Sequence, residues 1–482
     1  MEISKMNSKE NLKSLWSYNS VYQYHVITNS TIDSTTELIV EAAEKVVYMN
    51  DLEKRKQAYG ICGECNEPGT GEKWCQPCNS KRFKDNFKNW TSGNKDIDEF
   101  IQQSQLNAVH HMKYLEWIPF ENFKDITYIT KGGFGKIYSA KWPEGCIYFW
   151  NIENQEWKKY VDKKVALKSL DNSSCLSTEF LNEIKSHLQI YLLDVIQCYG
   201  ITQDPNTKDY MMVLNYCEDG NLRNYYMNNE SSYNSKIGRL FRIASGLLDI
   251  HNAGKIHKDF HSGNILYHSD TYSYISDLGM CQPANNEKQS VKQEGIYGVL
   301  PYMAPEVLRG YQYTKASDIY SFGIMMNEYI SEETPYNDIP HNHALAIKIC
   351  KGLRPNIFKF TPKLHADLIT KCWDAKAENR PTAKELYQEL MKLHFNGDND
   401  TQSQVNEYDN KIKLNRTSEK RSKNIQTHPQ AIYTSRLLNF KNLPEPVNSG
   451  AIQSTLFSEG FDCQLDESDL NEMNQDDENN IE

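Results

Sequence analysis

Apolar and polar residues alternate in two different ways along this chain, and the change marks a domain with two parts. Between about residues 120 and 216, short runs rich in β-branched and aromatic residues predict strands: "ITYIT", "GKIYSAKW", "KKVALKSL" and "YMMVLNY". Further on, "KIGRLFRIASGLLDIHNAG" and "ASDIYSFGIMMNEYIS" carry apolar residues at helical spacing. A strand-rich part followed by a helix-rich part predicts an α+β domain with two lobes.

The segments on either side of this domain have weaker patterns. In residues 1–58, strong helix formers in "TELIVEAAEKVVYMNDLEKRKQA" predict a helix over residues 36–58. Residues 83–117 read as a helical linker, in which Asp96 or Asp98 is the expected N-cap of "DIDEFIQQSQL". Residues 397–482 are polar, lack sustained periodicity and end in an acidic run, so we expect a mostly disordered acidic tail.

Composition narrows the class of protein. The 482 residues exceed one average domain, and the net charge of −11 argues against a protein that coats nucleic acid. The basic and aromatic stretch "NSKRFKDNFKNW" is read as a solvated helix rather than a nucleic-acid surface. The polar start lacks a signal peptide, and no apolar run approaches the roughly 20 residues of a spanning helix. We therefore expect a cytoplasmic protein without a membrane partner, with the nucleus as the alternative location.

Four of the 12 cysteines form two closely spaced Cys-x-x-Cys pairs, Cys62 with Cys65 and Cys75 with Cys78. Each pair can form a tight turn that aims two thiolates at one ion, which predicts a tetrahedral Cys₄ zinc knuckle in residues 59–82. Free thiols or a redox pair are the alternatives, but a redox site needs only one pair near a βαβ unit. Because all four positions would be filled, the expected zinc is structural rather than catalytic.

A glycine-rich turn lies between two of the predicted strands, in "ITKGGFGKIYSAKW". Gly132, Gly133 and Gly135 would let backbone N–H groups approach phosphates closely, although a plain hairpin has the same pattern. The next strand, "VALK", ends in Lys168, and Glu183 on the predicted helix "TEFLNEIKSHL" flanks its apolar face and lies within reach of that lysine.

Oxygen ligands are concentrated in two neighbouring stretches, "IHKDFHSGNIL" and "ISDLGM". The first contains Asp259 and Asn264, and Asp277 opens the second. Two carboxylates and an amide oxygen near one point suit a hard cation such as Mg²⁺.

Taken in order, these motifs together with "YMAPEVL" resemble the eukaryotic protein kinase family over residues 118–396. "GNLRNYY" and "CWDAKAENRPTA" resemble its tyrosine-kinase-like branch. The whole arrangement, cysteine pairs included, resembles kinase-like proteins expanded in arbuscular mycorrhizal fungi. The resemblance implies a small β-rich N-lobe and a large helical C-lobe, preceded here by a zinc-ribbon-like knuckle.

The resemblance also implies the substrates and the chemistry: ATP, Mg²⁺ or Mn²⁺, and a protein hydroxyl as acceptor. Lys168 would bind the α- and β-phosphates and pair with Glu183, with Glu179 as the lesser candidate for that partner. Asp259 would orient or deprotonate the acceptor hydroxyl. The metal would be held by Asn264 and Asp277.

Other positions are implied to bind nucleotide or to support the fold. Glu306 would pair with Arg380 in the C-lobe, and Asp318 would cap the backbone of the Asp259 loop. Leu214 would lie at the gate behind the adenine. The implied nucleotide-binding residues are Ile129, Gly132, Gly133, Phe134, Gly135, Ile137, Ala166, Lys168, Leu214, Asn215, Cys217, Leu266 and Asp277.

Several positions depart from the family pattern. Thr130 replaces the first glycine of the turn, Lys258 replaces the arginine before Asp259, and His261 replaces a lysine typical of Ser/Thr kinases. Val299 replaces a threonine typical of the same group, while Ser262 and "YMAPE" favour Ser/Thr specificity.

None of these changes removes the lysine, the base or a metal ligand, so the resemblance implies an active kinase, with Ser/Thr favoured over Tyr or dual specificity. Ser290 and Tyr297 are the candidate phosphate acceptors between "DLG" and "APE". Two other readings stay open: an ATP-binding pseudokinase scaffold, and a protein whose zinc knuckle is the main recognition module. The sequence does not indicate an oligomeric state.

Overall fold

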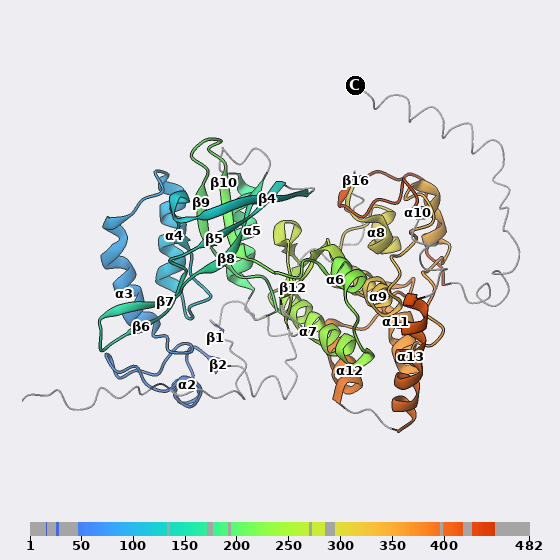
Figure 1. Cartoon of the computed structure of the whole chain (residues 1–482), viewed down its shortest axis with the longest axis horizontal. Helices are drawn as coiled ribbons and strands as arrows, with labels where there is room; N and C mark the ends of the chain where they lie inside the picture. The colour runs from blue at the N-terminus through green and yellow to red at the C-terminus, as the bar shows by residue number, and fades with distance from the viewer. Residues whose placement is uncertain are drawn as a thin grey trace, which may run out of the picture.

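The computed structural model describes the middle of the chain and two stretches nearer its C-terminal end. A β-rich lobe and a helical lobe lie side by side, and helices α3 and α4 of the N-terminal region lie on the far side of the β-rich lobe (Figure 1). This is the two-lobed α+β arrangement that the apolar pattern predicts. The described residues are 16, 26–27, 47–132, 135–170, 177–190, 194–268, 272–284, 295–395, 399–417 and 427–448.

The β-rich lobe is built on a six-stranded sheet with the strand order β3-β9-β10-β8-β5-β4. Neighbouring strands are antiparallel except for β3 and β9, which are parallel. Side chains alternate between the two faces, so Val165 and Leu167 enter one apolar cluster while Ala166 borders another. The strands are β3 (Glu116–Trp117), β4 (Lys124–Gly132), β5 (Gly135–Trp142), β8 (Lys163–Leu170), β9 (Cys198–Gln203) and β10 (Tyr210–Asn215).

Helix α5 (Thr178–Gln189) packs against one face of this sheet. It begins at Ser177, whose hydroxyl accepts a hydrogen bond from the Phe180 backbone N–H at 3.1 Å. Phe180 and Ile184 are fully buried in the same cluster as Ile201 and Met212 of the sheet. Glu183 is thereby held on the buried side of the helix.

The helical lobe packs around helix α9 (Lys315–Ser331), which is buried continuously from Ser317 to Ser331. A helix that is buried all round forms the centre of a core rather than its surface. The elements around it are α6 (Leu222–Asn228), α7 (Tyr233–Asn252), α8 (Pro305–Leu308), α10 (His343–Cys350), α11 (Lys363–Cys372) and α12 (Ala383–Phe395), with the pairs β11 (Lys255–Ile256)/β14 (Gln282–Pro283) and β12 (Ile265–His268)/β13 (Tyr272–Ile275).

The N-terminal region differs in part from the predicted helices. Residues 36–46 lie outside the described residues, and within the rest the helix begins only at α2 (Leu52–Tyr59), after strand β2 (Val47–Tyr48). Strand β2 pairs in parallel with β1 (Val26–Ile27). We call residues 47–115 the cysteine module; its other helices are α3 (Gln76–Asn86) and α4 (Lys95–Asn107).

The N-cap of α4 is Asn94 rather than Asp96 or Asp98. The Asn94 side chain accepts hydrogen bonds from the backbone N–H groups of Asp96 and Ile97. The helix therefore begins at Lys95, ahead of both predicted caps. Asp98 instead accepts hydrogen bonds from the backbone and hydroxyl of Ser92. Any of these residues can cap a helix, and the loop geometry selects among them.

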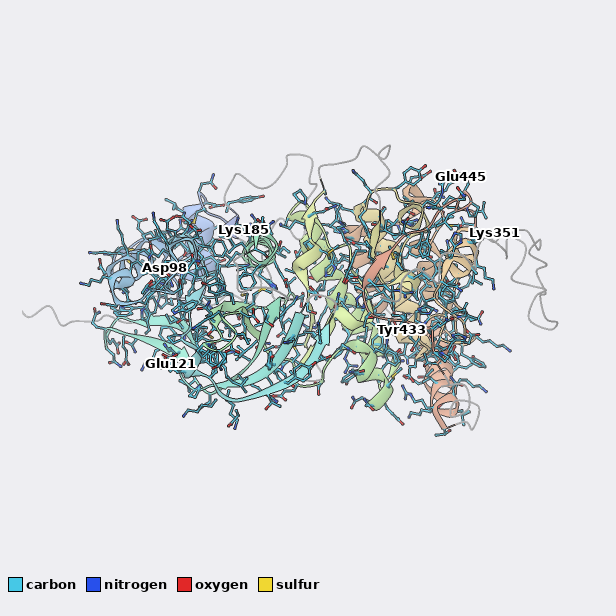
Figure 2. All side chains as sticks on the ribbon, turned by 90° about the horizontal axis from the view of Figure 1, so that it is seen from above. Asp98, Glu121, Lys185, Lys351, Tyr433 and Glu445 are labelled. Carbon is cyan, nitrogen blue, oxygen red and sulfur yellow. The ribbon has the colours of Figure 1, made fainter. Side chains whose placement is uncertain are left out.

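Helix α4 joins the cysteine module to the core of the β-rich lobe. Ile97 and Ile101 are fully buried in the same cluster as Phe180 and Ile184 of α5. Figure 2 labels Asp98 on α4 and Lys185 on α5, both in the same half of the molecule. The region predicted as a linker is therefore part of a folded core.

A hairpin that the sequence analysis did not predict connects β5 to β8. Its strands are β6 (Cys146–Asn151) and β7 (Glu156–Tyr160), and it packs on the cysteine module. The Tyr148 hydroxyl donates to Glu72 Oε1 at 2.6 Å, and Trp157 stacks on Trp74 with ring centroids 5.9 Å apart. The hairpin therefore extends the contact between the module and the sheet.

The expectation of a mostly disordered tail from residue 397 is wrong for residues 399–417, which form helix α13 (Asn399–Thr417). Val405, Tyr408 and Ile412 are buried in the core of the helical lobe. The Tyr408 hydroxyl also accepts a hydrogen bond at 3.0 Å from the fully buried Lys236. These three residues and the exposed Leu414 are the apolar residues of the helix, too sparse a pattern to predict this packing.

Residues 427–448, which we call the C-terminal segment, also depart from that expectation. They run across the helical lobe and contain strand β16 (Arg436–Leu438). Leu438 is buried in the lobe core, and Tyr433, Phe440 and Leu443 pack against it. Figure 2 labels Tyr433 and Glu445 of this segment on the helical lobe.

Among the described residues, no helix combines the length and the apolar character that crossing a membrane requires.

Candidate active site

Lys168 of β8 lies between two carboxylates that come from different lobes. Its Nζ donates to Glu183 Oε1 at 2.8 Å and to Asp277 Oδ1 at 2.9 Å. Burial favours the neutral amine, but the two nearby carboxylates outweigh it and raise the pKa of Lys168 above its usual value. The lysine therefore stays charged, and it connects the sheet, helix α5 and the start of the Asp277 segment.

The close approach of these segments depends on local backbone conformation. Asp277 has φ of 60°, in the left-handed region that non-glycine residues seldom adopt. Two residues later, a Cβ added at Gly279 would lie 3.0 Å from Glu183 Oε2. Gly279 thus leaves room for the Glu183 carboxylate beside the Asp277 segment.

Asp318 of α9 holds the backbone of the loop "IHKDFHSGNIL". This carboxylate accepts hydrogen bonds from the backbone N–H groups of His257 at 2.8 Å and Lys258 at 3.0 Å, and it contacts His251 Nε2 at 2.9 Å. Lys258 has φ of 71°, a strained conformation that these bonds help to hold. The loop backbone before Asp259 is therefore fixed from the core of the helical lobe.

Asn264 links the two oxygen-rich stretches. Its Nδ2 donates to the backbone oxygen of Asp259 at 2.9 Å, and its own backbone oxygen accepts from Ser276 N at 2.8 Å. Because the amide nitrogen is used in this way, the amide oxygen is the atom that can bind a cation. The second bond holds Asn264 next to Ser276, the residue directly before Asp277.

Asp259 is buried and has a hydroxyl next to it. Its Oδ2 accepts a hydrogen bond from Ser435 Oγ of the C-terminal segment at 2.6 Å and lies 3.6 Å from His261 Nε2. Burial acts to raise the pKa of Asp259, but the attraction of His261 and the bond from Ser435 outweigh it and lower the pKa. The carboxylate is therefore ionised near neutral pH and can accept a proton.

The apolar residues expected around the nucleotide come together from three strands and the other lobe. Ala166 pairs with Leu214 across β8 and β10, and Ile137 pairs with Lys168 across β5 and β8. Leu266 of β12 packs against the same cluster that contains Leu214 and Cys217. Together these residues line the junction of the two lobes.

The glycine turn is only partly described. Gly132 and Gly135 face each other as the last pair of β4 and β5, while Gly133 and Phe134 lie outside the described residues.

Three other predicted positions have different surroundings. Ile129 of β4 has 44% of its surface exposed. The backbone N–H of Asn215 donates to the Gln197 backbone oxygen at 3.0 Å. The side chain of Glu179, the lesser candidate for pairing with Lys168, also lies outside the described residues.

Further contacts support the helical lobe beneath the site. Arg380 donates to both oxygens of Glu306, at 2.7 and 2.8 Å. Ser262, expected to reflect acceptor specificity, is fully buried and donates to Glu328 Oε1 at 2.9 Å. The Ser262 hydroxyl therefore holds the loop to helix α9 and does not face an acceptor.

Of the two acceptors expected between "DLG" and "APE", Ser290 lies outside the described residues. Tyr297 lies in strand β15 (Ile296–Gly298), and its backbone oxygen accepts from the Tyr313 hydroxyl at 2.7 Å. Strand β15 pairs with β16 of the C-terminal segment.

The four paired cysteines gather at a second site, in the cysteine module. Their sulfur atoms all lie within 4.8 Å of one another, with Cys62 and Cys78 3.9 Å apart and Cys65 and Cys75 3.6 Å apart. A tetrahedral site with Zn–S bonds of about 2.3 Å places its sulfurs roughly 3.8 Å apart. The donor set and its spacing therefore fit zinc.

The protonation of these thiols also suits a metal. Interaction with the Cys75 thiol lowers the pKa of Cys62 to about 5, while burial raises the pKa of Cys78 to about 12. Several thiols in one small buried space share their protons unequally, and a bound cation would displace those that remain. Cys75 is the N-cap residue of α3, so Cys75 and Cys78 also lie at the positive end of that helix.

A buried arginine holds the loop that carries the first cysteine pair. Arg55 donates to the backbone oxygens of Met49, Pro68 and Gly69 at 2.6 to 3.0 Å. The fold of the loop is therefore fixed by protein contacts in addition to its cysteines.

Sequence reasoning missed a residue from far along the chain that contacts Asp259. Ser435 is 176 positions away along the chain, in a stretch read as disordered. The one signal for an ordered stretch is the group of apolar residues around it, in "IYTSRLLNF". Nothing in that group indicates where it binds.

Comparison with known proteins gives the family. Residues 123–390 match the family described as protein tyrosine and serine/threonine kinase. A tyrosine-protein kinase of Girardia tigrina is 27% identical over 283 residues, which cover 57% of this chain and 53% of that protein. A protein of Dictyostelium discoideum named as a probable LIM domain-containing serine/threonine-protein kinase is 30% identical over 271 residues, 55% of this chain and 38% of its own.

The chain spans about half or less of the length of these relatives. Their names include both acceptor classes. The family match covers more than half of this chain and contains the Lys168, Glu183, Asp259 and Asp277 constellation described above. This chain belongs to the protein tyrosine and serine/threonine kinase family.

Proposed function

We propose that this protein is an active kinase that transfers the γ-phosphoryl group of ATP to Ser or Thr hydroxyls of proteins. The observation that carries this proposal is the position of Lys168, bonded to both Glu183 and Asp277. Kinase catalysis is mostly positioning and charge stabilisation, and it requires the lysine–glutamate pair and the metal-binding aspartate together. All three residues are in contact here, so the geometry meets this requirement.

Each residue has a role that follows from its surroundings. Lys168, charged and buried, binds the α- and β-phosphates of ATP, and Asp259 accepts the proton of the acceptor hydroxyl. The hydroxyl oxygen forms a bond to the γ-phosphorus, the bond from that phosphorus to the β,γ-bridging oxygen breaks, and ADP leaves. Mg²⁺, held by Asn264 and Asp277, neutralises phosphate charge when bound.

Around the adenine, we propose a pocket formed by the side chains that meet where the lobes join. Ala166, Leu214 and Leu266 border one apolar cluster, and Ile137 lies on the neighbouring strand. Ile129 and the glycine turn with Gly133 and Phe134 would cover the nucleotide, and the backbone of Asn215 to Cys217 would bind the adenine edge. Apolar surfaces with a few backbone donors and acceptors are typical of such sites.

The preference for Ser or Thr rests on reach. Ser435 shows that a backbone near β15 can bring a short side chain to within 2.6 Å of Asp259. A tyrosine hydroxyl lies several ångströms further from its own backbone, so it would need a different path for the acceptor chain. The Dictyostelium relative is also named as a serine/threonine kinase.

Three further proposals complete this function. We place the chain in the tyrosine-kinase-like branch on the strength of "GNLRNYY" and "CWDAKAENRPTA". We assign structural zinc to Cys62, Cys65, Cys75 and Cys78, whose four sulfurs all lie within 4.8 Å of one another. We place the protein in the cytoplasm.

The test of the kinase proposal is transfer of labelled phosphate from Mg-ATP to a peptide library whose central residue is Ser, Thr or Tyr. Asp277→Ala should abolish transfer, because it removes a metal ligand and one partner of Lys168. Asp367→Ala, at an exposed carboxylate of α11 that pairs with Lys363, is the control. Nucleotide binding without transfer to any peptide or to the chain itself would favour a pseudokinase scaffold, and transfer mainly to Tyr would overturn the acceptor class.

A further inference from the structure

The C-terminal segment occupies the face of the helical lobe that adjoins Asp259. Strand β16 pairs antiparallel with β15, with Ile296 opposite Leu438, Tyr297 opposite Leu437 and Gly298 opposite Arg436. Strand β15 lies between "DLG" and "APE", the stretch that borders the acceptor site in this family. An extended peptide added to a short strand is a common mode of peptide recognition.

Contacts on both sides of β16 hold the segment in one register. Ahead of it, the Tyr433 hydroxyl donates to the Pro335 oxygen at 2.8 Å, and its ring lies 4.4 Å from the Arg223 guanidinium. Beyond it, Leu438 is buried in the lobe core, and Asn448 donates to Asp374 Oδ2 at 2.9 Å. The segment is therefore docked along its length and not only at β16.

This register brings one hydroxyl to the proposed catalytic base. Ser435, directly before β16, donates from Oγ to Asp259 Oδ2 at 2.6 Å, a distance suited to proton transfer. Thr434, one residue earlier, is exposed. A segment that only blocked the site would not need a hydroxyl at this point.

We propose that Ser435 is a phosphorylation site that this chain modifies in cis, with the C-terminal segment as the acceptor peptide of its own kinase domain. The proposal rests on the proposed kinase function. In the step, Ser435 Oγ forms a bond to the γ-phosphorus of ATP, the bond to the β,γ-bridging oxygen breaks, ADP leaves, and the Ser435 proton passes to Asp259. Atoms and charge balance without a further reactant.

The modification would also release the segment. A phosphoserine carries a charge of about −1.5 to −2 near neutral pH, and it would lie beside the Asp259 carboxylate. His261, 3.6 Å from that carboxylate, offsets only part of this repulsion. Before transfer the segment excludes other acceptors from Asp259, and after transfer the site is open to them.

The first experiment uses the full chain, dephosphorylated and then incubated with Mg-ATP, with Ser435 phosphate followed by mass spectrometry. Because the acceptor is tethered, the rate constant should stay unchanged over about a hundredfold dilution of the protein. Thr434→Ala should leave this reaction intact, and Ser435→Ala should remove it. A rate that falls in proportion to concentration would overturn the proposal.

The outcomes separate this proposal from the kinase function. Phosphate on a synthetic acceptor peptide without any on Ser435 overturns the cis reaction and leaves the kinase function standing. Absence of phosphate on both overturns the kinase function and the cis reaction together. The Asp277→Ala chain provides the background for both measurements.

A second experiment tests docking without relying on catalysis. Leu438→Asp places a charge in the lobe core, whereas Leu437→Asp places the same charge on a side chain that is 71% exposed. Without nucleotide, Leu438→Asp should speed amide exchange in residues 436–438 by about tenfold or more. With Mg-ATP, the same change should slow Ser435 phosphorylation and raise phosphorylation of the synthetic peptide by a similar factor. Leu437→Asp should change none of these by more than about twofold.

If Leu438→Asp does not fold, Tyr433→Ala serves instead, because it weakens the segment at its edge and leaves the lobe core intact. Equal effects of Leu437→Asp and Leu438→Asp would overturn the docking in this register. So would fast amide exchange of residues 436–438 in the unmodified chain, because it would show that the segment is not bound.

Discussion

The cysteine module packs on the β-rich lobe and the C-terminal segment on the helical lobe, and the two are attached in different ways. The module contributes Ile97 and Ile101 to the core of the β-rich lobe and Trp74 to a cluster of aromatic rings. The segment contributes one buried side chain, Leu438, and is otherwise held by hydrogen bonds, a short strand pairing and partly buried rings. The module therefore shares a core with its lobe, whereas the segment lies on the surface of its lobe and buries one side chain in the core.

This difference fits what each region touches. Helix α4 packs with α5, the helix that carries Glu183, so a fixed module keeps the Lys168 partner in place. The segment touches Asp259, which an acceptor must reach, so it has to leave for other acceptors to bind. The module, whose contact must persist during the proposed reaction, is therefore attached more firmly than the segment, whose contact must not.

The largest effect is expected when the proposed zinc site is broken. Cys75→Ser removes one of four ligands, and structural zinc contributes on the order of 10 kcal/mol to the folding of small domains. The chain should lose one equivalent of zinc and the order of residues 59–82, measured by metal analysis and amide exchange. Cys281→Ser, outside the cluster, should keep its zinc. A Cys75→Ser chain that kept both would show that the module is held by packing alone.

A smaller but still global effect is expected from Ile101→Ala. Deleting a fully buried isoleucine side chain leaves a cavity and costs about 2–5 kcal/mol of unfolding free energy. Chemical unfolding of the full chain should detect it, and Leu52→Ala on the exposed face of α2 should cost less than about 0.5 kcal/mol. If both changes were equally mild, α4 would not belong to the core of the β-rich lobe.

On the other side of the molecule, Tyr433→Ala should affect the segment alone. It removes a hydrogen bond and a contact with the Arg223 guanidinium, which together contribute about 1–2 kcal/mol. Amide exchange in residues 436–438 should speed up about tenfold while the midpoint of global unfolding stays the same. Tyr272→Ala, which removes a ring beside Arg242 at a distant site, is the matched control. A drop in global stability would mean that the segment is part of the core.

The smallest effect is expected at the end of the segment. Arg309 donates to Glu445 at 2.7 Å, but the Glu445 side chain is 78% exposed, and such pairs contribute less than about 1 kcal/mol. Glu445→Ala should leave the rate of Ser435 phosphorylation and the amide exchange of β16 nearly unchanged. High salt should change these two rates as little in the chain without the substitution. A large effect of either would show that ion pairs, rather than Leu438 and Tyr433, hold the segment.

Much of the kinase domain could be predicted from local sequence. Strands β4, β5, β8 and β10 and helices α7 and α9 coincide with stretches whose periodicity predicts them. The cysteine spacing indicated a cluster that the fold assembles. These features depend on residues close together in the chain, where spacing limits the structure.

The features that were missed depend on distant partners. Hairpin β6–β7 acquires its role by packing on Trp74 and Glu72, more than seventy positions earlier in the case of Tyr148 and Glu72. Helix α13 is mostly polar, and its place is set by Tyr408 meeting the buried Lys236, 172 positions away. Neither partner can be inferred from the segment itself.

By itself, the sequence determined which residues are the candidates for the chemistry: the lysine, the two aspartates, the asparagine and the four cysteines, each identified by its neighbours in the chain. Only the tertiary structure decided what lies against them: α4 behind Glu183, and Ser435 on Asp259. Docking depends on complementary surfaces from distant parts of the chain, and local periodicity carries no information about such surfaces. That is why a stretch read as a disordered tail contains a hydroxyl bonded to the proposed catalytic base.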